Sequence, residues 1–184
     1  MSVKFFPFYG TEREFLSGFS SEALDTITVD KYDSVLAVTI SGYQQIFRLS
    51  AGISDQISDK LAEKKIKYSI LKMDASRFMP ESVRNMFSDN PSHLDITRRN
   101  IIEMVDTAIF TFLKTLPSVR TDSSEIDSIF KAKHDLLLGM IPELEKGWRD
   151  LCEATADEIR KMANGKLAVV INLEMRYALE PKFE

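Results

Sequence analysis

Three short runs of apolar and β-branched residues set the strongest limit on how this chain can fold. They cover residues 34–40, 66–73 and 167–173, and Val, Ile or Leu fill most positions of the first and the last. Runs that are apolar on both faces are typical of strands inside a parallel sheet that helices cover on both sides. We therefore expect three strands here, with Ile70 and Ile171 among the core residues.

The segment between the first two runs carries a helical pattern. Residues 43–65 place apolar side chains at helical spacing, formed by Ile46, Leu49, Ile53, Ile57 and Leu61. Strand, helix and strand in this order predict a βαβ unit, in which the two strands are parallel and the crossover is right-handed.

Two further segments carry weaker strand signals. Residues 5–9 predict an edge strand, because Pro7 has no N–H group for a second neighbour. Residues 27–29 predict another strand, joined to 34–40 by a hairpin. The chain of 184 residues has the length of one domain and shows no repeat or linker. We expect a single α/β domain over 1–184 with a mixed, largely parallel sheet of about four strands flanked by long helices; an α+β arrangement is the alternative.

The second half of the chain is rich in helix signals, and its helix ends can be placed from individual residues. Ser92 and Asp95 have the spacing of a capping box, and so have Asp122 and Glu125. Each pair predicts the start of a helix. Proline breaks a helix interior and glycine is favoured just past a helix end, so three residues predict stops or breaks: Pro117, Pro142 and Gly165.

Charge and composition exclude several classes of partner. Lys and Arg number 24 against 28 Asp and Glu, for a net charge of −4, and neither half of the chain is basic. Nucleic acid is therefore not expected as a partner. No apolar run reaches the ~20 residues that span a bilayer, and no secretory leader is expected, so we predict no membrane contact. Cys152 is the only cysteine, which favours a cytoplasmic location.

The motifs of several common enzyme classes are missing. The sequence has no Walker loop, no dinucleotide-binding glycine pattern and no nucleophile elbow. One cysteine and two histidines are too few for a thiolate zinc site, so no metal site is predicted and no cofactor is assigned. Residues 180–182 have the E-x-K spacing of half a nuclease site, with Asp74 as a remote carboxylate, but Pro181 disfavours the strand that holds such a motif.

The best candidate site follows from topology. Ligands of open α/β sheets bind beyond the carboxyl ends of the strands, where backbone amides and polar side chains converge. A phosphorylated or carboxylated small molecule fits the donors found there, and the last strand contributes if it is parallel to the others. The predicted ligand-binding residues are Ser41, Gly42, Ser76, Arg77, Glu174 and Arg176. The alternative is that residues 41–42 form only a turn and that Arg77 forms only a surface salt bridge.

Two residues are candidates for catalysis. Asp74 follows the strand over 66–73 and is suited to hold a hydroxyl group or a metal ion. His134 lies on or beside an apolar helix face and is suited to act as a general base near neutral pH. The alternative for His134 is a buried histidine whose ring nitrogens are satisfied by neighbouring residues.

A second class of function is an oligomeric scaffold or interaction module without catalytic activity. The predicted helix over 101–116 is apolar over more than one stripe. Such a helix is buried on several sides, either within the fold or in a subunit interface. A homodimer is therefore expected alongside, or instead of, a small-molecule site.

Overall fold

A computed structural model describes residues 2–8, 25–27, 32–42, 46–47, 59, 61–63, 65–116 and 123–184. Within these residues the chain forms one four-stranded sheet in the order β1-β4-β2-β3, and every pairing is parallel. The predicted α/β class is therefore confirmed. The elements in chain order are β1 (Ser2–Phe8), β2 (Ser34–Ser41), β3 (Tyr68–Asp74), η1 (Ala75–Arg77), α3 (Glu81–Met86), α4 (His93–Lys114), α5 (Ser124–Met140), α6 (Leu144–Met162), β4 (Lys166–Asn172), α7 (Leu173–Leu179) and η3 (Glu180–Lys182).

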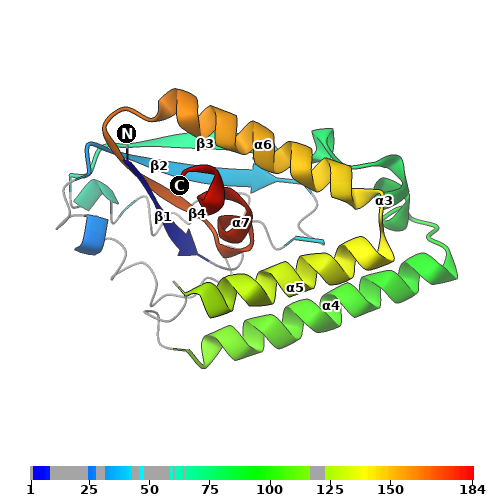
Figure 1. The fold of residues 1–184 in the computed structure, drawn as a ribbon. Helices are drawn as coiled ribbons and strands as arrows, with labels where there is room; N and C mark the ends of the chain where they lie inside the picture. Colours follow the sequence, from blue (N-terminus) through cyan, green and yellow to red (C-terminus); the bar gives the residue numbers. More distant parts are fainter. Residues whose placement is uncertain are drawn as a thin grey trace.

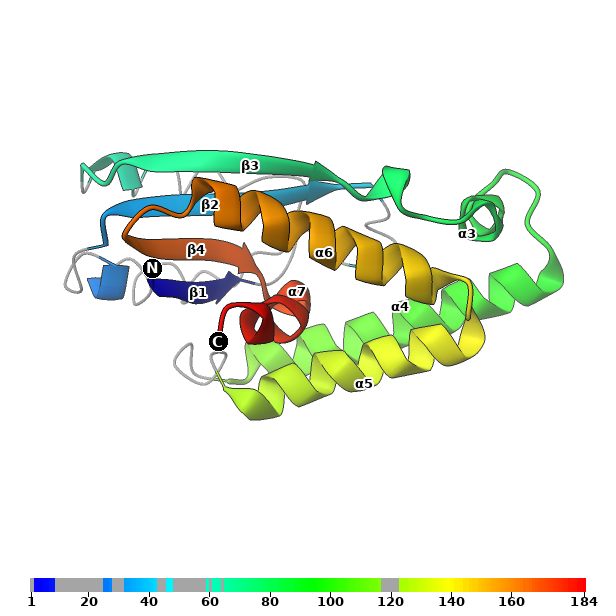
Figure 2. The same ribbon diagram turned by 45° about the horizontal axis from the view of Figure 1, so that its top comes forward.

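The central strands β2 and β4 are buried on both faces, as their apolar runs predict. Alternate side chains of a strand point to opposite faces, and here they join two separate apolar clusters. Leu36 and Val169 pack with the apolar stripe of α6, which lies along one face of the sheet (Figure 2). Ala37 and Val170 face the other side, where they pack with residues that include Phe6 and Leu61.

The two edges of the sheet differ in burial. β1 is an edge strand, as predicted, and Phe5 and Phe8 are both buried. β3 forms the other edge, and the side chain of Ile70 is 44% exposed. The expectation that Ile70 belongs to the core is therefore wrong, because an edge strand gains neighbours on one side only. Ile171 on the central β4 is fully buried, as expected.

The parallel pairing of β2 with β3 agrees with the predicted βαβ unit. The connecting segment, residues 43–65, lies largely outside the described residues, apart from buried Ile46, Phe47 and Leu61 and a helical stretch at 61–63. Residue 27 ends a short helical segment at 25–27, which corrects the expected strand there, and residues 28–29 lie outside the described part.

The helix boundaries test the capping and breaking signals. Ser92 caps α4: its Oγ accepts a hydrogen bond from the Asp95 backbone N–H (3.2 Å), and the Asp95 carboxylate accepts one from the Ser92 N–H (3.3 Å). The first capping box is thus confirmed. The second pair predicts a helix start, and α5 begins at Ser124 with Ser123 at its N-cap position; Asp122 lies outside the described residues. The break at Pro142 is confirmed, since α5 ends at Met140 and α6 begins at Leu144.

Helices α4 and α5 run side by side along one side of the molecule, with α5 nearer the sheet (Figure 1). α7 begins directly after β4 and packs between the sheet end and α5. None of the described helices has the length and apolar character needed to cross a bilayer.

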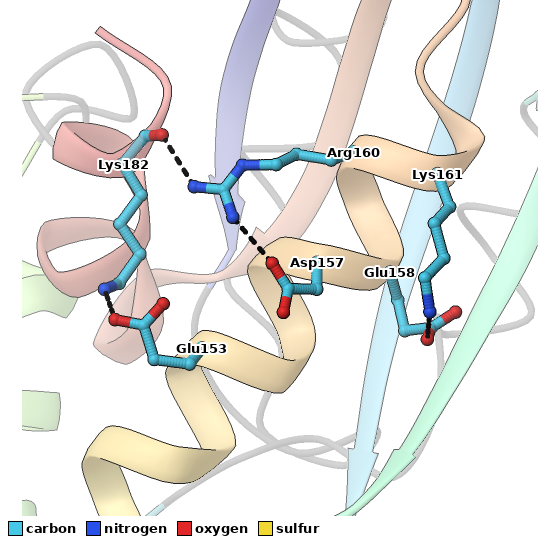
Figure 3. Close-up of polar contacts among 6 residues, drawn as sticks. All are labelled: Glu153, Asp157, Glu158, Arg160, Lys161 and Lys182. Atoms are coloured by element: carbon cyan, nitrogen blue, oxygen red, sulfur yellow. Dashed lines mark hydrogen bonds and ion pairs between the residues drawn. The ribbon is translucent and has the colours of Figure 1, made fainter.

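Ion pairs and hydrogen bonds of charged residues connect the segment after β4 to α6 (Figure 3). Lys182 contacts Glu153 through its ammonium group, and its carbonyl oxygen accepts a hydrogen bond from Arg160 (3.0 Å). Residues 180–182 form the 3-10 helix η3, so they do not provide the strand that an E-x-K nuclease half-site requires.

Candidate functional site

The ends of β2 and β3 bring five of the predicted site residues together. Ser41 and Asp74 are register partners, and the Ser41 hydroxyl donates to the Met73 carbonyl (3.3 Å). Gly42 has φ +80°, and a Cβ there would lie 3.1 Å from the Ser76 backbone nitrogen. Only glycine adopts this conformation easily, so Gly42 allows the two strand ends to approach closely.

Asp74 organises the turn that follows β3. Its Oδ1 accepts hydrogen bonds from the Ser76 N–H (3.0 Å) and the Ser76 hydroxyl (2.6 Å), which caps η1. These hydrogen bonds, the side-chain one first, lower the pKa of Asp74. The carboxylate is thus ionised at neutral pH, and it is better suited to accept hydrogen bonds than to transfer protons.

Arg77 lies beside this carboxylate at the surface. Its Nε is 3.8 Å from Asp74 Oδ2, and its side chain is 79% exposed. An exposed ion pair of this length contributes about 0–1 kcal/mol to stability. A guanidinium has five N–H donors in a fork that matches carboxylate and phosphate groups, so Arg77 can exchange its protein partner for an anion at little cost.

Glu174 and Arg176 follow β4, which is parallel to the other strands, but both are buried in α7. Arg176 donates to Asp127 (2.9 Å) and to the Ser123 carbonyl (3.0 Å), both at the start of α5. The structure therefore places their contacts on the helices rather than at the ends of β2 and β3.

Sequence reasoning missed a buried charge network around Glu174. Lys133 Nζ lies 2.6 Å from Glu174 Oε1 and 2.5 Å from Asp106 Oδ1, and all three side chains are buried. Burial lowers the pKa of Lys133, but the two carboxylates outweigh this effect and the net shift is upward. Burial raises the pKa of Glu174, and Lys133 with His134 reverses that shift. Lys133 is therefore a cation between two carboxylates, and it joins α4, α5 and α7.

His134 lies next to this network and is buried. Its Nδ1 contacts the Tyr177 hydroxyl, its Nε2 is 3.6 Å from Glu174 Oε2, and its ring packs edge-on against Trp148 and Phe47. Burial lowers the pKa of His134, so the ring is neutral at pH 7. The ring is enclosed and Nδ1 has a local partner, but Nε2 has no hydrogen-bond partner among the described residues, so His134 fits the alternative of a satisfied buried histidine only in part. The only sequence signal for the network was the polar pair 133–134 within an apolar helix stripe.

A cavity of about 510 Å³ lies between the start of α5 and the residues after β4. Its charged lining is mixed, with Lys131 and Arg176 against three carboxylates: Asp127, Glu180 and Glu184. The residues that line this cavity do not include any from the polar turn after β3. The charged groups of the lining carry no net positive charge that would attract an anion. Within the described ranges, no group of three or more His, Cys, Asp or Glu side chains is arranged to hold a metal ion.

Comparison of the chain with protein-family models, with curated proteins and with solved structures gave no match. The function is therefore inferred from the residues of the site.

Proposed function

We propose that this protein binds a small anionic molecule, phosphorylated or carboxylated, at the carboxyl ends of β2 and β3. The observation that carries the proposal is the register of these strands, which sets Ser41 and Gly42 against the turn that holds Asp74, Ser76 and Arg77. Carboxyl edges of parallel strands are the usual ligand sites of open α/β sheets. Arg77 supplies a fixed positive charge, the serines supply hydroxyl groups, and Asp74 accepts a hydrogen bond from a ligand hydroxyl.

The proposed activity is binding, and no catalytic step is assigned to it. Asp74 is held as a hydrogen-bonded carboxylate, and His134 is buried among its own neighbours. A cytoplasmic location is proposed with it, because the single cysteine, Cys152, is a buried free thiol on α6. Burial raises the pKa of this thiol to about 12, so Cys152 is not proposed as a nucleophile.

A ligand panel and one arginine variant test the proposal. Nucleotides, sugar phosphates and small carboxylates are screened by thermal shift, since a ligand that binds only the native state raises the midpoint of unfolding. We expect Arg77→Ala to weaken binding at least tenfold, or about 1.4 kcal/mol, because it removes the fixed charge. Its stability should stay within about 0.5 kcal/mol of the wild type, as for other exposed substitutions.

The matched control is Arg149→Ala on α6. Arg149 is also exposed and also forms a long ion pair, at 3.9 Å from Asp150. It should leave ligand affinity unchanged. Equal losses of affinity in the two variants, or no loss in Arg77→Ala, would contradict the proposed site.

A second candidate function is a homo-oligomeric interaction module. The observation that favours it is the outer face of α4, where Met104 and Phe112 are exposed to solvent. Large contiguous apolar patches are rarely exposed on monomeric proteins, and where they occur they mark interaction sites.

A further inference from the structure

The outer face of α4 is an exposed helix surface almost free of charge. Four of the seven large hydrophobic residues that are exposed in the described part of the chain lie on α4, and Met104 is 72% exposed. A shallow groove of about 920 Å³ runs along this helix from Asn100 to Thr115, and among the described residues Glu103 is the only charged one that lines it. Depletion of charge with exposed Met and Phe is the composition of an interface centre. In Figure 1 α4 lies at the lower edge of the molecule, with α5 between it and the sheet.

The spacing along this face is that of a helix-pairing seam. Asn100, Met104, Thr107 and Thr111 follow one another at steps of four, three and four residues, which is the alternation of a two-helix seam. Threonine side chains and Ala108 lie in the middle of this face. Along the helix axis, Met104 lies about one turn before Ala108 and Phe112 lies about one turn after it. Small residues at the centre let two helix backbones approach closely, while a large side chain at each end fills the space beyond.

The charges at the margin of the seam are complementary to each other. Glu103 and Lys114 are eleven residues apart, which is about three helical turns, so they lie on the same side of α4. Both are exposed, and Lys114 Nζ lies 4.1 Å from the centre of the Phe110 ring on that side. Among the described residues, neither has an ion-pair partner within 4.0 Å.

We propose that two copies of this chain pair through α4, with the two helices antiparallel about a two-fold axis close to Ala108. In that arrangement Glu103 of each copy meets Lys114 of the other, and Met104 of each copy packs against Phe112 of the other. A two-fold interface uses the same patch on both copies, so the patch must be self-complementary. The face of α4 meets this requirement, because it carries both members of the charged pair and both members of the apolar pair. The proposal deepens the second candidate function and is independent of the anion site.

The antiparallel direction follows from the same charges. Parallel helices would set Glu103 beside Glu103 and Lys114 beside Lys114, and like charges at a helix margin oppose pairing. Antiparallel helices with the axis at Ala108 place residues whose numbers sum to 216 at the same level. This relation matches 104 with 112, and it brings 103 and 114 to within one residue, or about 1.5 Å, of the same level. The apolar side chains and the charges therefore agree on one register.

The first experiment locates the interface. Sedimentation of the full chain over a range of concentrations should show a monomer–dimer equilibrium. Phe112→Asp should raise the dissociation constant at least tenfold, because it buries a charge in the seam. The matched control is Leu136→Asp on α5, since Leu136 is 43% exposed and Phe112 is 45% exposed. Leu136→Asp should change the dissociation constant less than twofold.

The second experiment tests the direction by charge reversal. Glu103→Lys alone and Lys114→Glu alone should each weaken self-association, because each places like charges together at both ends of the seam. The double variant, and an equimolar mixture of the two single variants, should recover pairing. Single variants that associate as well as the wild type would overturn the antiparallel arrangement.

The third experiment uses cysteine cross-links with the buried Cys152 left in place. Antiparallel helices set the two copies of residue 104 about 12 Å apart along the axis, too far for a disulfide. Met104→Cys alone should therefore not cross-link, whereas a mixture of Met104→Cys and Phe112→Cys should cross-link on oxidation. Cross-linking of Met104→Cys alone overturns the direction. A dimer unaffected by Phe112→Asp overturns the interface, and a wild-type monomer at every concentration overturns the second candidate function as well.

Discussion

At the scale of single residues, Lys133 is the side chain that connects the buried carboxylates of Asp106 and Glu174. Its ammonium group lies between Asp106 of α4 and Glu174 of α7, with both contacts at 2.5–2.6 Å. A buried ion pair contributes little relative to a well-packed apolar group, but removing one partner leaves an uncompensated charge. The network therefore fixes how three helices meet rather than adding a large net stability.

Replacing Lys133 with Met should lower the free energy of unfolding by about 3–5 kcal/mol, because Asp106 and Glu174 then face each other without a cation. Urea unfolding followed by circular dichroism measures the loss. Lys131→Met on the same helix is the control, since Lys131 is exposed and forms an ion pair with Asp135 (3.0 Å). It should cost less than about 1 kcal/mol. Similar losses in the two variants would show that the buried network does not form.

Stability should fall when the pH drops below about 6.5, and His134 is the first cause. Burial lowers the pKa of His134, so over this pH range the ring is protonated in the unfolded state and stays neutral in the folded state. The slope reaches about 1.4 kcal/mol per pH unit for one proton. The pKa of Glu174 is lowered, so its contribution is lost in turn as the pH falls below its ordinary value of 4.5.

Urea midpoints between pH 8 and pH 5 measure this slope. In His134→Gln, stability should depend less steeply on pH between pH 6.5 and pH 5. His93→Gln is the control, because His93 is exposed, and it should leave this dependence unchanged. An unchanged profile in His134→Gln would contradict the assignment.

At the scale of elements, the helix ends follow from residues that are neighbours in the sequence. The turn between α6 and β4 depends on Gly165, which has φ +75°, and a Cβ there would lie 2.3 Å from Asp33 Oδ2. The same Asp33 oxygen accepts a hydrogen bond from the Lys166 N–H (2.6 Å), so this turn also secures the entry to β2.

Two glycine substitutions should therefore act in opposite directions. Gly165→Ala should lower the unfolding free energy by more than about 1 kcal/mol, because it combines backbone strain with a steric clash. Gly139 lies inside α5 with no atom within 4 Å of an added Cβ, so Gly139→Ala should raise it by about 0.5–1 kcal/mol. Thermal or urea unfolding measures the stability of both variants. A Gly165→Ala protein as stable as the wild type would contradict the proposed role of Gly165 in this turn.

At the scale of the whole molecule, the order of the strands decides which apolar runs form the core. β4 comes last in the chain, yet it lies between β1 and β2, while β3 is left at an edge. Two isoleucines from predicted strands consequently differ in burial, with Ile171 fully buried and Ile70 44% exposed.

Truncation of these two side chains measures the difference. Ile171→Ala should cost about 2–5 kcal/mol, since it removes buried methyl groups and leaves a cavity. Ile70→Ala should cost markedly less, because water already reaches that side chain. A loss below about 0.5 kcal/mol in Ile171→Ala would be inconsistent with a central β4.

Much of the candidate site could also be anticipated from strand ends. The predicted strand ends lie within four residues of Ser41, Gly42, Asp74, Ser76 and Arg77, and parallel pairing of neighbouring strands then brings these residues to one edge. Glu174 and Arg176 met the same criterion, but the chain turns directly into α7 after β4 and buries both.

Local sequence patterns predicted the four strands of the sheet, the capping box at Ser92, the break at Pro142 and the end of α6 near Gly165. Each of these depends on backbone preferences or hydrogen bonds among residues a few positions apart. The central place of β4 in the sheet and the contacts of Lys133 with Asp106 and Glu174 depend instead on tertiary packing. Those contacts join residues 27 and 41 positions apart, and a pairing at that separation depends on how the helices pack rather than on any local pattern.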